Sequence, residues 1–189
     1  MILVIIDPQR GFFDPAVPAD LEGRLESLLS RKPFKAVIAT RFVSEANGPF
    51  ERFADWDGLH GSEQDICPGI RPWLDAIIPK KGFSGATRPV MRALQEVNGG
   101  CMPKAVFLAG TDTEACVLAT AMAFFEQGVR PVVLADYCAS SGGMSVHEAG
   151  LLCLERSIGP RNVMRGDPDR LNGRWPVKTE LLSAQETGA

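Results

Sequence analysis

Residues 104–121 read KAVFLAGTDTEACVLATA, and this stretch holds the pattern that decides the fold. Lys104 to Ala109 is an apolar run of the kind found in strands that are buried on both faces. After the short turn, Thr113 to Gln127 has a helical pattern, and Gly128 follows it at the position where helices often end. A strand that leads directly into a helix is the repeating unit of a parallel sheet.

The same alternation of strand-like and helix-like segments extends over most of the chain. Apolar runs predict strands at 2–6, 35–40, 104–109 and 130–135, with a shorter apolar piece at 76–79, and helical spacing predicts helices at 20–30, 89–97, 113–127 and 145–158. The sequence therefore predicts an α/β fold with a parallel sheet that has helices on both faces.

Length and spacing predict one domain, residues 1–164, followed by a partly irregular tail, residues 165–189. The end of that tail, 183–189, is expected to be frayed. A long polar connection, 41–68, interrupts the alternation. Connections of this length in a compact domain are usually functional, so it is expected to form a lid or a pocket wall.

Composition excludes several classes of function. The net charge is −3 and no Lys/Arg run exceeds two neighbours, so neither nucleic acid nor a membrane surface is an expected partner. The apolar run at the N-terminus is too short for a secretory signal, and no stretch is long enough for a membrane span. Five cysteines without CxxC spacing indicate neither a disulfide framework nor a structural zinc site. We expect a protein of the reducing cytoplasm.

Ligands of doubly wound sheets bind beyond the carboxyl ends of the strands, so residues that directly follow strands are the candidates for chemistry. Cys116 lies at the start of a predicted helix. With Thr113 as the N-cap, the free N–H groups of the first turn would favour its thiolate. The alternative is that Cys116 is a small buried residue of the core.

Asp7 and Lys80 are the other two candidates, because each follows an apolar run. A carboxylate at the tip of a buried strand is poorly solvated, and its pKa can rise enough for it to shuttle protons. The alternative for Asp7 is a turn residue before Pro8. The alternative for Lys80 is an ordinary solvated charge.

The remaining thiols and histidines are weaker candidates. Cys153 stands among leucines and is expected in the core, whereas Cys138 follows a strand and is the rival thiol. His147 is expected on a solvated helix face, and His60 lies in the long connection, where it could touch a ligand. A Cys–His pair is the alternative arrangement that these residues leave for a thiol nucleophile. GxGxxG, GxxxxGK[ST], HExxH and GxSxG motifs are absent.

Three motifs occur in order: DPQRGFF from Asp7, KKGFSGA from Lys80, and GTDTEACVLATA from Gly110. Together they resemble the isochorismatase-like cysteine hydrolases, which include nicotinamidases and N-carbamoylsarcosine amidohydrolases. The resemblance runs from residue 1 to about residue 163. It implies a three-layer α/β/α sandwich with a six-stranded parallel sheet, and a homo-oligomer of two or more subunits.

The resemblance also implies roles for single residues. The family's catalytic triad falls on Asp7, Lys80 and Cys116, with Lys80 preferred to Lys81 because the family lysine stands four residues before a serine, here Ser84. A cis peptide bond falls on Thr111–Asp112. It would direct the N–H of Asp112, with that of Cys116, toward an oxyanion. An aspartate at position 112 departs from the family pattern.

Positions of the family's aromatic pocket walls fall on Phe12 and Trp56, for which ordinary core packing is the alternative. Nicotinamidases bind a metal through histidines after the second strand, whereas this chain has TRFVSE from Thr40 and no histidine there. We therefore expect neither a metal nor another cofactor, and nicotinamide is not the expected substrate.

The function expected from these observations is cleavage of a small-molecule amide or carbamoyl C–N bond through a thioester on Cys116. The first alternative is an isochorismatase-type vinyl-ether hydrolase, which does not depend on a cysteine at this position. The second is a non-catalytic oligomeric binding protein that keeps the fold.

Overall fold

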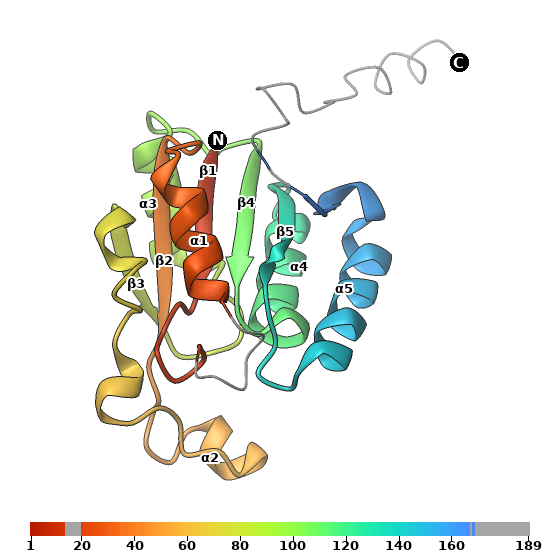
Figure 1. The fold of residues 1–189 in the computed structure, drawn as a ribbon. Coiled ribbons are helices and arrows are strands. Elements are labelled where there is room, and N and C mark those ends of the chain that lie inside the picture. The colour runs from red at the N-terminus through yellow and green to blue at the C-terminus, as the bar shows by residue number, and fades with distance from the viewer. Residues whose placement is uncertain (14–19, 167, 169–189) are drawn as a thin grey trace, which may run out of the picture.

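A computed structural model describes residues 1–13, 20–166 and 168, and it contains one parallel sheet of six strands in the order β3-β2-β1-β4-β5-β6. The strands are β1 (Ile2–Ile6), β2 (Ala36–Phe42), β3 (Ala76–Lys80), β4 (Ala105–Gly110), β5 (Arg130–Cys138) and β6 (Val163–Met164). All neighbouring strands pair in parallel (Figure 1). The predicted α/β fold and its six-stranded parallel sheet are confirmed.

Helices connect the strands and cover both faces of the sheet (Figure 1). They are α1 (Leu21–Ser30), α2 (Pro49–Ala54), α3 (Arg88–Val97), α4 (Leu118–Glu126) and α5 (Met144–Ile158), with short 3-10 turns at Gly61–Gln64, Arg71–Trp73 and Pro160–Asn162. The predicted helix at 113–127 begins as a π-helical turn, Thr113–Val117, before it continues as α4. No helix within the described ranges is long and apolar enough to cross a membrane.

Alternate side chains of the central strand β1 enter two different cores. Ile2, Val4 and Ile6 pack in the core under α3, α4 and α5, whereas Leu3 and Ile5 pack in the core under α1. All five side chains are buried. Because successive strand residues point to opposite faces, a continuous apolar run is what a strand covered on both faces requires.

The sheet is wound in both directions from its centre. From β1 the chain continues to β2 and β3 on one side, and β4, β5 and β6 lie on the other. The carboxyl ends of β1 and β4 approach each other closely at Gly110, whose φ is +115° and where an added Cβ would lie 2.1 Å from the carbonyl oxygen of Ile6. This close approach brings the residues after β1 and those after β4 together.

Two sequence expectations about α5 are wrong. Cys153 is exposed rather than in the core, because α5 turns Leu151, Leu154 and Ile158 toward the sheet and leaves 153 on the outer face. His147 is buried rather than solvated, because it lies one turn before Leu151 on that same inner face.

The connection at 41–68 contains the end of β2, helix α2 and a 3-10 turn, and it extends beyond the carboxyl end of the sheet (Figure 1). Gln9 holds it to β1: its side chain donates to the carbonyl oxygens of Phe42 and Gln64 and accepts the N–H of Phe42. The predicted frayed end at 183–189 lies outside the described residues.

Candidate active site

Asp7, Lys80 and Cys116 converge at the carboxyl edge of the sheet although they are far apart in sequence. Asp7 directly follows β1, Lys80 is the last residue of β3, and Cys116 lies in the π-helical turn after β4. Parallel strands end at the same edge, and this edge is where ligands bind in sheets of this kind. The sheet therefore places all three predicted side chains at the expected location.

The lysine ammonium stands between the carboxylate and the thiol. Nζ of Lys80 lies 2.7 Å from Oδ2 of Asp7, and both side chains are fully buried. The same Nζ donates to Sγ of Cys116 at 3.4 Å. One cation thus contacts both a buried anion and the sulfur atom.

Backbone and side-chain contacts fix the orientation of the Asp7 carboxylate. The hydroxyl of Thr40 donates to Oδ1 of Asp7 at 2.8 Å and accepts the Asp7 N–H at 3.1 Å. The residue itself adopts a left-handed conformation, with φ 48°. Burial raises the pKa of Asp7, although the charge of Lys80 and hydrogen bonds from Lys80 and Thr40 act in the opposite direction. Asp7 is therefore a stronger base than a solvated aspartate.

Lys80 is held by its own loop. Its ammonium donates to the carbonyl oxygens of Gly82 and Phe83 at 2.7 and 3.1 Å, and it lies 5.4 Å from the centre of the Phe42 ring. Lys81, by contrast, is exposed and pairs with Glu45 at 2.9 Å. Of the two adjacent lysines, only Lys80 points toward Asp7.

The surroundings of Cys116 differ from the sequence expectation. Asp112, not Thr113, precedes the turn, and no side chain caps the turn's N-terminus. The Thr113 hydroxyl instead donates to the carbonyl oxygen of Ala139 and contacts Nδ1 of His147 at 2.7 Å. Burial raises the pKa of the Cys116 thiol to about 12; the negative charge of Asp7 adds to this effect and Lys80 partly opposes it. The resting group is a thiol, because burial and Asp7 outweigh the cation.

The peptide bond between Thr111 and Asp112 is cis. The carbonyl oxygen of Asp112 accepts the N–H groups of Ala115 and Val117, on either side of Cys116. Its carboxylate accepts two hydrogen bonds from Ser141, one from the backbone N–H at 2.7 Å and one from the hydroxyl at 2.8 Å. Burial raises the pKa of Asp112. The side chain thus anchors the turn of Cys116 to the loop before α5.

The ring of Phe42 lies next to Lys80, and further aromatic rings pack around it. The ring centres of Phe12 and Trp56, two residues that the sequence singles out, lie 5.9 Å apart, and both rings contact that of Phe42. Phe50 contacts Phe42 and Trp56, and it also contacts Phe83, which is half exposed. We call Phe12, Phe42, Phe50, Trp56 and Phe83 the aromatic cluster. The sequence placed Phe42 just after a predicted strand and Phe83 in the motif that begins at Lys80, but it did not predict that their rings and that of Phe50 meet, because ring contacts across loops leave no local pattern.

His60 and the other cysteines are placed differently from the triad. His60 is exposed, and its ring lies 3.1 Å from the carboxylate of Asp57. Cys138, the rival thiol, is the last residue of β5 rather than a residue of the loop after it; its side chain is buried in the core, and burial raises its pKa to about 12. Within 1–13, 20–166 and 168, no group of three or more His, Cys, Asp or Glu side chains is arranged to hold a metal ion.

Comparison with known proteins gives two results. A family model described as the isochorismatase domain matches residues 1–160. A search of curated proteins returns no match.

Solved structures of similar fold include three hydrolases. An isochorismatase-like hydrolase from Alkaliphilus metalliredigens is 20% identical, with 87% of this chain and 93% of that chain covered and a TM-score of 0.68. A pyrazinamidase/nicotinamidase from Streptococcus mutans is 17% identical, with 86% and 99% covered and a TM-score of 0.68. A nicotinamidase from Bacillus subtilis is 18% identical, with 87% and 98% covered and a TM-score of 0.67. At these identities the likeness is one of fold.

Proposed function

The chain belongs to the isochorismatase family of hydrolases, and from this premise we propose that it cleaves the C–N bond of a small-molecule amide or carbamoyl compound through a thioester on Cys116. One observation carries the proposal: a buried ion pair between Asp7 and Lys80 stands directly against the sulfur of Cys116. Covalent catalysis by cysteine requires a base for the thiol proton and stabilisation of the thiolate. Asp7 and Lys80 supply these two requirements.

In the first half of the reaction, Asp7 accepts the thiol proton while Sγ of Cys116 attacks the carbonyl carbon. Because the resting thiol has a pKa of about 12, proton transfer and attack are coupled rather than preceded by a stable thiolate. Lys80 offsets the charge that develops on sulfur. The backbone N–H groups of Asp112 and Cys116 are the proposed donors to the oxyanion. Asp7 then returns the proton to the nitrogen, and the amine or ammonia leaves.

In the second half, water attacks the thioester carbon. Asp7 accepts a proton from this water, the C–S bond breaks, and Asp7 returns the proton to the sulfur as the carboxylic acid leaves. Each turnover thus converts one amide and one water into one acid and one amine. The buried ion pair is restored at the end of the cycle.

Two kinds of evidence favour an amide over a vinyl ether as substrate. An acyl transfer through a covalent intermediate needs a nucleophile, and the sulfur of Cys116 lies 3.4 Å from Nζ of Lys80. Two of the proteins of similar fold are named as nicotinamidases. The aromatic cluster reaches Lys80 through the ring of Phe42, which favours a substrate with a flat or apolar body.

A screen of carboxamides, ureido acids and carbamoyl compounds for ammonia release tests the proposal. We expect the wild type and Cys153→Ala, which alters an exposed thiol, to be active, and Cys116→Ala to lose at least about 10³-fold in kcat/KM. Activity toward a vinyl ether that survives Cys116→Ala would instead support the ether hydrolase. Equal activity of Cys116→Ala and wild type on amides would refute the thioester route.

A further inference from the structure

Thr120 carries a polar side chain in an apolar setting. It is the third residue of α4, and its side chain is fully buried. The nearby residues Val117, Ala121 and Phe124 belong to the core on this face of the sheet. A buried hydroxyl costs free energy unless it is hydrogen-bonded, so the partners of this hydroxyl indicate what it does.

The hydroxyl of Thr120 bonds to two segments that lie far apart in sequence. It donates to the carbonyl oxygen of Cys116 at 2.6 Å and accepts the backbone N–H of Gly85 at 2.7 Å. A bond from a threonine to the carbonyl four residues earlier is common within helices. The bond to Gly85 is not of this local kind, because Gly85 belongs to the loop that follows Lys80 at the end of β3. One hydroxyl thus joins the turn of the nucleophile to the loop of the lysine.

These bonds close a ring of contacts that begins and ends at Cys116. From its carbonyl oxygen the ring passes through the Thr120 hydroxyl to Gly85, and two residues back along the chain it reaches Phe83. The carbonyl oxygen of Phe83 accepts a bond from Nζ of Lys80 at 3.1 Å, and the same Nζ donates to Sγ of Cys116 at 3.4 Å. The distance between ammonium and sulfur therefore depends on the Thr120 hydroxyl, not on the lysine side chain alone.

The absence of a side chain at Gly85 allows this close contact. An added Cβ would lie 3.0 Å from Cγ2 of Thr40 and 3.2 Å from Oγ1 of Thr120. Thr40 is the residue whose hydroxyl donates to the Asp7 carboxylate. The loop after β3 therefore packs against the residue that orients the base as well as against the residue that is bonded to the nucleophile's carbonyl.

We propose that Thr120 is a positioning residue, whose hydroxyl holds the ammonium of Lys80 against the sulfur of Cys116 by tying their two segments together. This role rests on the proposed function, in which Lys80 offsets the charge that develops on sulfur. Without the hydroxyl, the N–H of Gly85 loses its partner in the interior, so the loop relaxes and the ammonium moves away from the sulfur. Because Lys80 lowers the pKa of the Cys116 thiol, its withdrawal makes the thiol less reactive.

Alkylation of Cys116 by iodoacetamide at pH 10 tests this role without any substrate. We expect Thr120→Val, which keeps the shape of the side chain without its hydroxyl, to react at least about threefold more slowly than the wild type, and Thr120→Ser to react like the wild type. Exposed Cys153 in the same sample is the reference for the reagent. An unchanged or faster reaction of Thr120→Val, or a Thr120→Ser variant as slow as Thr120→Val, would overturn the proposal.

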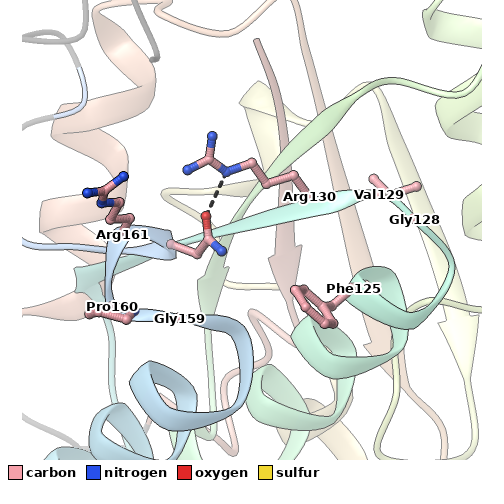
Figure 2. Close-up of a pocket in the computed structure, with 8 residues that line it drawn as sticks. Phe125, Gly128, Val129, Arg130, Gly159, Pro160 and Arg161 are labelled. Carbon is pink, nitrogen blue, oxygen red and sulfur yellow. Dashed lines mark hydrogen bonds between the residues drawn. The ribbon is translucent and has the colours of Figure 1, made fainter. Parts of the chain in front are cut away.

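Two control variants show whether the response is specific. Oγ1 of Thr87 is buried and has no hydrogen-bond partner in the described part of the chain, so Thr87→Val removes a hydroxyl without breaking a bond. Arg161→Gln changes an exposed side chain in the turn before β6, beside the hollow at the amino end of β5 that Figure 2 shows. Both variants should react like the wild type. A loss in Thr87→Val equal to that in Thr120→Val would contradict a role specific to the Thr120 hydroxyl.

Gly85→Ala reaches the same contact from the other side and replaces Thr120→Val if that variant does not fold. The added Cβ presses on Thr40 and Thr120 while the hydroxyl remains. Slower alkylation of Cys116 is therefore expected here too, and a wild-type rate would overturn the proposal.

Turnover of an amide from the screen gives a second reading. We expect Thr120→Val to lower kcat at least about tenfold with less than about a twofold change in KM, because the hydroxyl acts on the reacting groups and not on the bound substrate. A loss that appears in KM alone would contradict the positioning role. Slow alkylation of Thr120→Val, together with no turnover of any amide by the wild type, would support the positioning role and refute only the proposed function.

Discussion

Asp7 and Lys80 carry opposite charges where neither side chain reaches water. A buried ion pair contributes little net stability compared with apolar residues, but removal of one member leaves an uncompensated charge in the interior. We therefore expect the pair to serve catalysis rather than stability. The interaction between its two charges can be measured from the free energies of unfolding of variants.

A double-mutant cycle measures the coupling within this pair. We expect Asp7→Asn and Lys80→Met each to lower the free energy of unfolding by about 3–5 kcal/mol, because each strands the other charge. The double variant should lose much less free energy of unfolding than the two single variants lose together. Urea denaturation followed by circular dichroism gives all four values, and strictly additive losses would show that the two charges do not interact.

Cys116 provides a prediction about pH. Its pKa of about 12 means that the thiol is protonated throughout the neutral range, because burial and the charge of Asp7 outweigh Lys80. Alkylation by iodoacetamide should therefore be slow at pH 7 and keep rising above pH 10. Asp7→Asn should move this rise to lower pH, since it removes a negative charge that opposes the thiolate.

Exposed Cys153 in the same protein is the reference for reagent access in this experiment. Peptide mass spectrometry gives the two rates separately. Rapid alkylation of Cys116 below pH 7 would agree with the thiolate that the sequence predicted at a helix N-terminus, and would contradict the environment found in the structure.

At the scale of elements, the approach of β1 to β4 at Gly110 determines where Asp7 and Cys116 lie relative to each other. A side chain at this position would meet the backbone of Ile6, and the φ of +115° is unfavourable for any other residue. We expect Gly110→Ala to lower the free energy of unfolding by at least about 2 kcal/mol, from the combined clash and strain.

Gly82→Ala is the matched control for that substitution. Gly82 has no atom within 4 Å of an added Cβ and no positive φ, so the change should have little effect on stability. Thermal denaturation of both variants checks the pair. Similar melting temperatures for Gly110→Ala and Gly82→Ala would mean that the two strands can separate without cost at this point.

The elements that the sequence predicted share a physical property. Strands buried on both faces, such as β1, and helices with one apolar face, such as α1, have patterns that are set by burial alone. The two-residue strand β6 and the π-helical turn Thr113–Val117 have no such pattern. Pairing with β5 determines β6, and the contacts around Asp112 determine the turn. Local sequence carries no record of such contacts.

At the scale of the whole molecule, the candidate site could be predicted in part because its reactive side chains lie at or just after the ends of strands. Asp7 and Lys80 stand at strand ends and Cys116 lies in the turn after β4, and a parallel sheet brings these places together. Their environment could not be predicted, since the burial of the thiol and the packing of Phe42, Phe50 and Phe83 depend on loops that meet only in the folded chain.

The outer surface suggests an assembly. Met122 and Phe125 on α4, with Met144 and Leu152 on α5, are large apolar side chains that remain exposed in the single chain. Exposed apolar side chains on neighbouring elements are typical of subunit interfaces. We therefore expect light scattering to give a mass of at least twice 20.4 kDa.

Leu152→Glu is expected to shift that mass toward 20.4 kDa, because it places a charge on the α5 part of this surface. Glu148→Gln alters another exposed residue of α5 without adding a charge and should leave the mass unchanged. A wild-type mass of one chain at micromolar concentration would contradict the expected assembly.

The most direct test of the proposed chemistry is mass spectrometry of the enzyme quenched in acid during turnover of an amide found in the ammonia-release screen. We predict that the peptide containing Cys116 gains the mass of the acyl group, that hydroxylamine removes it, and that no such adduct forms in Cys116→Ser or on the peptide containing Cys138. An acyl adduct on another residue, or steady turnover of the amide with no adduct on Cys116 at any quench time and no trapping by hydroxylamine, would contradict a thioester on this sulfur.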